Sequence, residues 1–565
     1  MSLRLRGVEY AYAGTTTPVL RGIDLEVEPG QIVGVVGPND AGKSTLCLVA
    51  AGLAPNVIGG RLVGTVEVDG ADVRALRPFE VAQRVGILFQ NPQTQLSGTT
   101  ATVFEEVAFG PRNLGLPVDE LVERVRWALA AVGIADLSER DPQRVSGGQA
   151  QLIALASVLA LRPAVLVLDE PTSQLDPAGT RLVADRLRGI AMETGTAILI
   201  VEHKASVLAR VASEVLALDT GRIVERGGVE VLSRASVNAL GVQAPSATTI
   251  ARAAADAGVA DRLSGLDLVA IELDSDAGRE APGESSAKPG PASSTADLAI
   301  RCIGVGFTYP DGTRALHDVA LDVARGTSVA IVGQNGSGKS TLVRQFIGLL
   351  RPSAGEVVVN GRPVGRRHVA ELAAEVGLAF QNPDRQIFSS RARAEVEFGA
   401  RNIGLRGAAL DAAVRDALAA VGLADRAGAN PYDLGYSRRK LLSLASILAM
   451  GTPILVLDEP TTGQDQRGID RVAEIVSASR AAGRTVIAIS HDLGFVAEHF
   501  ERVVVMRDGS VILDEPIETV FAERNWALLA TTFLEPPLAA RVGVALDVGP
   551  TPTPAALVAA LSRGA

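Results

Sequence analysis

A twelve-residue pattern occurs twice in this chain, and that duplication limits the possible folds more than any other feature. The segment VLVLDEPTSQLD at 165–176 returns as ILVLDEPTTGQD at 454–465, 289 residues further on. Lys43 and Lys339, each in a Gly-Lys-Ser-Thr segment, are separated by 296 residues, so the spacing changes only slowly along the chain. A period of this length is far too long for a solenoid, and it predicts two copies of a whole domain.

The repeat sets the predicted domain boundaries. We expect a first domain at 1–232 and a second at 298–525. The stretch 233–297 is predicted to be a weakly helical appendage that ends in a flexible linker, because its last part, 274–297, is rich in Gly, Pro, Ser and Ala. Residues 526–565 follow the second domain in the same way, so each half is expected to end in an accessory segment.

Composition favours an α/β protein that is neither exported nor bound to nucleic acid. Hydrophobic residues make up 47% of the chain and aromatic residues only 4%, as expected for buried parallel strands covered by helices. The mean hydropathy is +0.24, yet no apolar run reaches the roughly 18 residues of a membrane-spanning helix, and the N-terminus lacks a signal-peptide pattern. The net charge of −10 disfavours a nucleic-acid surface, and the two distant cysteines, Cys47 and Cys302, match no metal-ligand spacing.

Two glycine-rich segments predict phosphate-binding loops. QIVGVVG at 31–37 is typical of a buried strand, GPNDAGKST at 37–45 of a loop, and LCLVAAGL at 46–53 of a helix, and GQNGSGKST at 333–341 repeats the loop. In this strand–loop–helix order the backbone N–H groups and the helix N-terminus face the phosphates. Each Lys is expected to reach the β- and γ-phosphates and each following Ser to bind Mg²⁺. The predicted nucleotide-binding residues are Gly37, Asn39, Gly42, Lys43, Ser44 and Thr45 in the first loop, and Gly333, Asn335, Gly336, Gly338, Lys339, Ser340 and Thr341 in the second.

Paired carboxylates end the repeated strands VLVLDE and ILVLDE. Asp169 and Asp458 are predicted to bind Mg²⁺ at the carboxyl edge of a sheet, next to the phosphate loop. Glu170 and Glu459 are predicted to act as general bases that polarise the attacking water. A single such pair is usually a solvated turn, but two copies beside two phosphate loops favour the catalytic interpretation.

Histidines follow later apolar strands at equivalent positions of the two halves. His203 stands in LIVEHK and His491 in AISHD, and the chain contains only five histidines. A lone histidine at such a position is more often structural. Its recurrence in both halves favours a catalytic role in sensing or orienting the γ-phosphate.

Together these segments closely resemble the ATP-binding cassette family, over about four-fifths of the chain. The most specific match is VSGGQ at 145–149, which resembles the family signature and precedes the carboxylate strand in the expected order. The resemblance implies two P-loop nucleotide-binding domains, each with a mixed, largely parallel sheet and a helical signature subdomain. It also implies ATP and Mg²⁺ as cofactors, and head-to-tail pairing of two cassettes, both supplied here by one chain. It assigns the signature residues Ser146, Gly147, Gly148 and Gln149 to the partner cassette's ATP, Tyr12 and Tyr309 to adenine stacking, and Gln90 and Gln381 to the Q-loops that contact Mg²⁺ and water.

The Q-loop stretches narrow the resemblance further. FQNPQTQL at 89–96 and FQNPDRQIF at 380–388 are similar to the cassettes of energy-coupling-factor importers. That resemblance implies uptake of a vitamin, such as a thiamine precursor, or of a transition-metal ion. The implied partners are a transmembrane subunit and a small substrate-capturing membrane protein, with the ATPase at the cytoplasmic face of the membrane. The fused ATPase of a sugar importer and a ribosome-associated translation factor are the alternatives.

The second half departs from the signature, and the first from the usual phosphate loop. Residues 435–438 read Gly-Tyr-Ser-Arg where 146–149 read Ser-Gly-Gly-Gln, and Asp40 stands where the other loop has Gly336. In the head-to-tail arrangement implied by the resemblance, both changes fall in one composite ATP site. We therefore expect unequal sites, with the altered one binding ATP but hydrolysing it more slowly.

Overall fold

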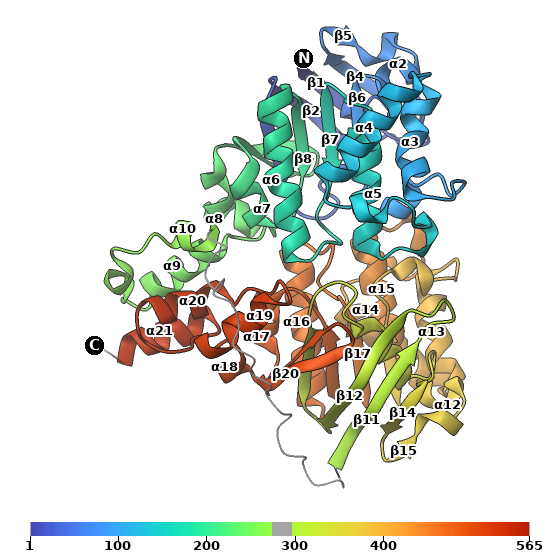
Figure 1. Cartoon of the computed structure of the whole chain (residues 1–565), viewed down its shortest axis with the longest axis vertical. Coiled ribbons are helices and arrows are strands. Elements are labelled where there is room, and N and C mark those ends of the chain that lie inside the picture. Colours follow the sequence, from blue (N-terminus) through green and yellow to red (C-terminus); the bar gives the residue numbers. More distant parts are fainter. Residues whose placement is uncertain (1, 274–296, 564–565) are drawn as a thin grey trace. The chain divides into compact units, whose positions relative to one another are not determined.

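The computed structural model describes residues 2–273 and 297–563 and divides into two compact units, Met1–Pro245 and Ser246–Ala565 (Figure 1). The predicted flexible linker at 274–297 lies outside the described residues except for Asp297. Within the described residues no helix is long and apolar enough to cross a membrane, and no group of three or more His, Cys, Asp and Glu side chains is arranged to hold a metal ion.

The first unit contains two sheets. The larger has six strands in the order β10-β9-β3-β8-β7-β6, parallel except for the edge pair β9–β10. The smaller is antiparallel, with the order β2-β1-β4-β5. The strands are β1 (Leu3–Ala11), β2 (Leu20–Val27), β3 (Ile32–Val36), β4 (Arg61–Val68), β5 (Ala71–Asp72), β6 (Val85–Leu88), β7 (Val165–Asp169), β8 (Ala197–Val201), β9 (Glu214–Asp219) and β10 (Arg222–Gly227).

Helices cover both faces of the larger sheet because its central strands are apolar on both sides. Every residue of β3, β7 and β8 is buried, which the alternating faces of a strand require when helices pack above and below. Val165 and Val167 share a core with α1, whereas Leu166 and Leu168 share one with α3 to α7. The helices are α1 (Lys43–Ala50), α2 (Pro78–Ala82), α3 (Val103–Asn113), α4 (Val118–Ala131), α5 (Gly147–Leu159), α6 (Pro177–Thr194), α7 (Ala205–Val211) and α8 (Ala235–Ala239).

The second unit repeats this topology. Read from its other edge, the six-stranded sheet has the order β20-β19-β13-β18-β17-β16, which matches the first unit strand for strand, and the smaller sheet has the order β12-β11-β14-β15. The strands are β11 (Leu298–Thr308), β12 (Arg314–Ala324), β13 (Ser328–Val332), β14 (Ala354–Val359), β15 (Arg362–Pro363), β16 (Val376–Ala379), β17 (Ile454–Asp458), β18 (Thr485–Ile489), β19 (Arg502–Arg507) and β20 (Ser510–Pro516). The prediction of two tandem α/β domains with mixed sheets is confirmed.

The helices of the second unit fall into two groups. Those of the repeated domain are α11 (Lys339–Phe346), α12 (Val369–Ala373), α13 (Ala392–Asn402), α14 (Gly407–Ala420), α15 (Tyr436–Leu448), α16 (Gln466–Ala481) and α17 (Leu493–His499). The others precede or follow it: α9 (Ser246–Asp256), α10 (Leu268–Leu273), α18 (Ile517–Val520), α19 (Trp526–Ala530), α20 (Leu538–Ala545) and α21 (Pro554–Arg563). Four of them, α9, α10, α20 and α21, share a small core of their own.

Candidate functional site

The first glycine of each phosphate loop occupies a position that no other residue fits. Gly37 has a φ of 152°, and a Cβ built there would lie 2.1 Å from the carbonyl oxygen of Leu218 on β9. Gly333 has a φ of 146° and faces the carbonyl oxygen of Met506 on β19 at the same 2.1 Å. The loop therefore turns tightly against the neighbouring strand, as a phosphate-binding loop must.

The loop lysines point into the concave side of their own loops. Lys43 Nζ donates to the carbonyl oxygens of Gly37 and Pro38 at 2.8 Å each. Lys339 Nζ does the same to Gly333 and Gln334 at 2.7 Å each. Both side chains are buried, so a positive charge is held at the place where loop N–H groups converge.

Asp40 adopts the left-handed backbone that the loop requires. Its φ is 64°, against 83° for Gly336 at the matching position. Asp is one of the few residues other than Gly that tolerate this region. The side chain is exposed, so the first loop keeps its shape and gains a carboxylate on its surface.

The two predicted adenine tyrosines are tied to the loop helices. Tyr12 Oη lies 3.0 Å from Thr45 Oγ1, and Tyr309 Oη lies 3.0 Å from Thr341 Oγ1. Each ring also packs edge-on against a neighbouring aromatic ring, with centroids 5.1 Å and 4.9 Å apart. Both rings are half-buried, and each leaves part of its surface open beside its phosphate loop.

The carboxylates at the ends of β7 and β17 are buried and suited to a cation. Burial, together with Glu170, raises the pKa of Asp169 to about 7, and burial with Glu459 raises the pKa of Asp458 to about 6. Ser340 Oγ donates to Asp458 Oδ1 at 3.3 Å. Asp169 Oδ1 is buried without a hydrogen-bond partner among the described residues, so it has an oxygen lone pair available for a metal or its bound water.

The adjacent glutamates are held in a strained conformation beside the histidines. Glu170 and Glu459 each have a φ of 52°, outside the strand geometry of the residue before them. His203 Nε2 lies 3.2 Å from Glu170 Oε1, and His491 Nδ1 lies 2.8 Å from Glu459 Oε2. Burial raises the pKa of both glutamates, but the facing histidine and loop lysine outweigh it and leave each pKa below its ordinary value. Each glutamate is therefore a buried, ionised base.

The residues of the Q-loop pattern have clear local roles. Asn91 Oδ1 accepts a bond of 3.1 Å from the backbone N–H two residues on and so caps the turn Pro92–Thr94. Gln95 Oε1 accepts from the backbone N–H six residues before it at 3.0 Å. Asn382 and Gln386 make the same bonds in the second unit, at 2.9 Å and 3.1 Å. The common pattern thus builds a common loop.

The Q-loop glutamines themselves differ between the units. Gln90 Nε2 donates to Glu170 Oε1 at 2.8 Å, so the first glutamate is held from both sides. The Gln381 side chain makes no hydrogen bond within residues 2–273 and 297–563.

The two signature helices begin differently. Ser146 caps α5, and Gln149 Oε1 accepts from the Ser146 N–H at 3.0 Å, which completes a capping box. Gly435 precedes α15 without a side-chain cap. Within the described part of the chain, 146–149 make no hydrogen bond with the phosphate loop 37–45 of their own unit.

The altered signature differs from the intact one by two opposite changes in side-chain size, one within the signature and one outside it. A Cβ on Gly147 would lie 2.4 Å from Gln174 Oε1. The second unit has Tyr436 and Gly463 at the two matching positions, so the larger residue of the pair is in the signature in the second unit and outside it in the first. Ser437 Oγ also donates to Gln464 Oε1 at 2.6 Å, and Gln464 Nε2 donates back to the Ser437 carbonyl at 3.1 Å. The altered segment is therefore closely packed rather than degraded.

Sequence analysis missed one buried residue of each signature helix. Gln151 Nε2 donates to the carbonyl oxygen of Glu170 at 3.0 Å. At the equivalent position Lys440 Nζ donates to the carbonyl oxygen of Thr462 at 3.0 Å, and its charge helps lower the pKa of Glu459. The only available signal was their position two residues after the signature, which does not reveal a long-range contact.

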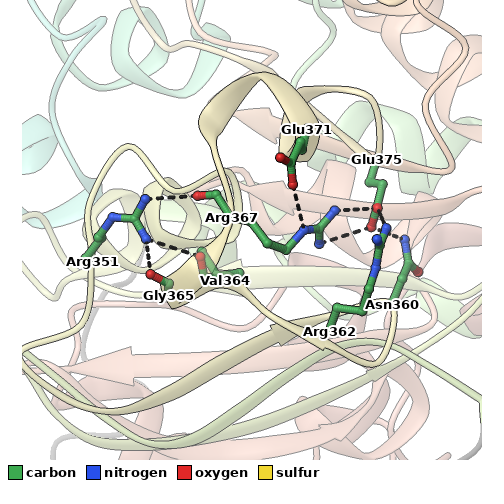
Figure 2. Close-up of polar contacts among 8 residues, drawn as sticks. All are labelled: Arg351, Asn360, Arg362, Val364, Gly365, Arg367, Glu371 and Glu375. Carbon is green, nitrogen blue, oxygen red and sulfur yellow. Dashed lines mark hydrogen bonds and ion pairs between the residues drawn. The ribbon is translucent and has the colours of Figure 1, made fainter.

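Polar side chains brace the strand that leads into the second Q-loop. Glu375 immediately precedes β16, and its carboxylate accepts hydrogen bonds from three side chains, Asn360, Arg362 and Arg367 (Figure 2). Arg367 is buried and Arg362 exposed. Burial raises the pKa of Glu375, but Arg367 and Asn360 outweigh it and leave the pKa below its ordinary value. Arg351 braces the same turn by donating to three backbone carbonyl groups.

Fold and site together define a tandem P-loop ATPase, and comparison with known proteins identifies its family. The family model described as ABC transporter matches residues 20–173 and 316–462. The chain is 35% identical to an ABC transporter ATP-binding protein of Methanosarcina mazei, over 97% of this chain and 93% of the relative. It is 34% identical to one of Caldanaerobacter subterraneus, over 92% of this chain and 91% of the relative. The chain belongs to the ABC transporter family and is an ATP-binding ATPase with two cassettes.

A solved structure with lower coverage is also similar. CbiO1 of Clostridium perfringens, described as part of the ABC transporter complex CbiONQ, is 31% identical over 44% of this chain and 99% of its own length, with a TM-score of 0.38. The family assignment rests on the family model and the full-length relatives.

Proposed function

We propose that the chain is the ATP-hydrolysing subunit of an energy-coupling-factor importer for a vitamin, such as a thiamine precursor, or for a transition-metal ion. ABC transporter ATPases work with transmembrane subunits, and we extend this to a small substrate-capturing membrane protein at the cytoplasmic face of the membrane. No nucleic-acid partner is part of the proposal, in keeping with the net charge of −10.

The observation that carries the importer type is the Phe-Gln-Asn-Pro-x-x-Gln stretch in both cassettes. Asn and the last Gln of each stretch make the same backbone bonds, so both Q-loops present the same shape. Both halves therefore suit one kind of partner, which favours a shared transmembrane subunit over the fused sugar-importer alternative.

The chemistry follows from the residues of each cassette. The loop lysine and N–H groups bind the ATP phosphates, and the buried glutamate orients and deprotonates the attacking water. The facing histidine keeps that carboxylate in place. Mg²⁺, when bound, offsets negative charge that develops on the phosphates. The residues that would hold it are Ser44, Gln90 and Asp169 in the first cassette, and Ser340, Gln381 and Asp458 in the second.

The two sites are proposed to be unequal, given head-to-tail pairing within one chain. One site combines the second phosphate loop, Glu459 and His491 with the intact signature 145–149, and it hydrolyses ATP at full rate. The other combines the first phosphate loop, Glu170 and His203 with 434–438, and it turns ATP over more slowly. Asp40 adds a negative charge near the phosphates of this second site.

Purification of the full chain from detergent-solubilised membranes tests the importer assignment. The chain carries an affinity tag, and Lys339→Ala serves as a control that keeps assembly but reduces hydrolysis. We expect a multi-span subunit and a small membrane protein to co-purify, and we expect the transported vitamin or metal ion to stimulate ATP turnover of the reconstituted complex. Co-purification with ribosomes, or with a transmembrane pair lacking the small protein, would contradict the proposal.

A further inference from the structure

One stretch of the first cassette is longer than its counterpart in the second. Gly52 and Gly348 follow the loop helices α1 and α11 at matching positions, with φ of 68° and 73°. Gly64 and Gly355 also match, because a Cβ on either would meet backbone carbonyl oxygens of the neighbouring strand, β1 or β11. Eleven residues separate Gly52 from Gly64, and six separate Gly348 from Gly355. We call residues 53–63 the insert, because the matching segment of the second cassette is five residues shorter.

The insert packs closely against the end of β1. A Cβ on Gly60 would lie 2.5 Å from the carbonyl oxygen of Ala11 and 2.7 Å from Tyr10 Oη, and the φ of Gly60 is 101°. A side chain at this position would therefore collide with the strand. Tyr10 is fully buried, and its hydroxyl donates to the carbonyl oxygen of Gly59 at 2.6 Å. This hydrogen bond ties the insert to β1.

The insert also extends the small sheet toward Tyr12. Arg61 pairs with Ala11, so β4 accompanies β1 up to the residue before Tyr12 (Figure 1). In the second cassette β14 accompanies β11 only up to Gly306, three residues before Tyr309. The strand end that carries the first tyrosine is thus paired on this side nearer to the tyrosine than its counterpart is, and it has less freedom to move.

Tyr10 connects the insert to the predicted adenine tyrosine. Its ring packs edge-on against Tyr12, with centroids 5.1 Å apart, and Tyr12 Oη in turn lies 3.0 Å from Thr45 Oγ1. Phe307 stands at the position of Tyr10 in the second cassette and packs on Tyr309 in the same way, but it has no hydroxyl group to hold a loop. The difference between the two cassettes is therefore the hydroxyl of Tyr10 and the insert that it holds.

We infer that Tyr10 and the insert form a brace in the first cassette that positions Tyr12 for the adenine ring of ATP. The inference rests on the proposed function, in which Tyr12 stacks on adenine. Tyr10 is a positioning residue, because it acts through that ring. A ring that is held in place before the nucleotide arrives loses less conformational freedom when adenine stacks on it. The brace thus tightens ATP binding at the site proposed to be slower, and it acts against the repulsion from Asp40.

Competition for a photoaffinity label tests the inference on the full chain. 8-Azido-ATP is crosslinked with Mg²⁺ on ice, and mass spectrometry of proteolytic peptides reports the label in each cassette separately. The unlabelled competitors are ATP and inorganic tripolyphosphate, which has no adenine. Tyr10→Phe keeps the ring and removes the hydrogen bond to the insert.

Tyr10→Phe is expected to weaken ATP binding at the first cassette about fivefold, because one buried hydrogen bond is lost. Tripolyphosphate binding at the first cassette, and ATP binding at the second, are expected to change less than about twofold. Unchanged ATP binding at the first cassette would overturn the inference. Equal weakening of ATP and tripolyphosphate binding would also overturn it, since the brace would then act on the phosphate loop and not on adenine.

A double-mutant cycle shows whether Tyr10 acts through Tyr12. In a Tyr12→Leu background, Tyr10→Phe is expected to change ATP binding less than about 1.5-fold, and a fivefold loss there would contradict the positioning role. Replacing the insert with residues 349–354 is expected to weaken ATP binding at least as much as Tyr10→Phe does, and unchanged binding would overturn the inference. Val57, which is 61% exposed on the insert, supplies the matched control. Val57→Ala is expected to change ATP binding less than about twofold, and a loss as large as that of Tyr10→Phe would count against the brace.

The same measurements separate failure of the brace from failure of the proposed function. They require neither hydrolysis nor a membrane partner. Unchanged ATP binding in Tyr12→Leu alone would contradict the proposed role of Tyr12. A loss in Tyr12→Leu without a loss in Tyr10→Phe would contradict only the brace.

Discussion

The two cassettes share the geometry of their candidate catalytic residues and differ in the segments around them. Both have a glycine pressed against a strand carbonyl, a buried lysine in the loop, and a strained glutamate beside a histidine. They differ at the phosphate-loop position of Asp40 and at the start of the signature helix, where a capping box is replaced by an uncapped glycine. Since the duplication, both halves have kept the loop glycine, lysine, glutamate and histidine, whereas the phosphate loop and the start of the signature helix have diverged.

The altered signature is compensated within its own unit. Gly147 lies against Gln174, the residues at the two matching positions are Tyr436 and Gly463, and Ser437 exchanges hydrogen bonds with Gln464. Such paired changes indicate a segment that packs in a specific alternative way. They favour a site with a modified role over one that has simply lost function.

The largest expected difference concerns the loop lysines. Lys339→Met is expected to lower ATP turnover of the assembled complex by about 100-fold or more, because a charge-assisted contact to the phosphates is lost at the site proposed to hydrolyse ATP at full rate. Lys43→Met affects the site proposed to be slower and is expected to lower turnover less than about fivefold. Steady-state ATPase rates of the two variants check this. Equal losses would show that the sites contribute equally.

A signature exchange is the next test of the comparison. Gly147→Tyr places a side chain where a Cβ already meets Gln174 Oε1 at 2.4 Å, and it is expected to lower ATP turnover about tenfold. Adding Gln174→Gly reproduces the second unit's pair and is expected to recover most of the stability that Gly147→Tyr removes from the first cassette, while ATP turnover stays low as at the altered site. A double-mutant cycle on denaturant unfolding measures the coupling. If the two losses of stability simply add, the size-exchange explanation is wrong.

Removing the Asp40 carboxylate from the first phosphate loop should have a smaller effect, on ATP binding. Asp40→Gly removes an exposed negative charge without changing the loop shape, and it is expected to tighten ATP binding at the first loop about fivefold. Gly336→Asp is the mirror variant and should weaken binding at the second loop to a similar extent. Calorimetric titration of the full chain at low and high salt checks both. A change that persists at 1 M salt would point to loop distortion instead of charge.

The smallest expected effect on activity concerns the cluster around Glu375. Arg367→Leu removes the buried partner of this carboxylate and is expected to lower the stability of the second cassette by about 2 kcal/mol, with ATP affinity changed less than about twofold. Arg362→Leu removes an exposed partner of the same carboxylate and should cost less than about 1 kcal/mol. Denaturant unfolding of both variants gives the comparison. Equal losses would show that burial of Arg367 contributes nothing.

The fold class was predictable because its signals are local and repeated. Apolar strands ending in a Gly-rich loop or paired carboxylates identified β3, β7 and β17 to within one or two residues. The first loop helix begins at Lys43 and ends at Ala50, three residues before the predicted range at each end. Gly42 adopts a left-handed conformation directly before the helix, and Gly52 adopts one just after it. These two glycines set the ends of the helix, and the sequence pattern alone did not indicate which of the nearby glycines would do so.

Features that depend on distant contacts were not predictable. The repeat located the phosphate loops, carboxylates and histidines, and each unit brings its own set together. Nothing local indicated that 246–273 would pack with the C-terminal helices, because short alanine-rich helices carry little pairing information. The contacts of Gln151, Lys440 and Gly147 are likewise with residues 19 to 27 positions further along the chain. Contacts over such distances leave no local pattern in the sequence.

The most direct test of unequal sites compares the two general bases. Glu170→Gln and Glu459→Gln keep the shape of the side chain and remove its capacity to accept a proton, so each silences one site. ATP turnover of the assembled complex is measured for both. We expect Glu459→Gln to lower it at least about 100-fold and Glu170→Gln less than about fivefold. Equal losses, or a larger loss from Glu170→Gln, would contradict the account.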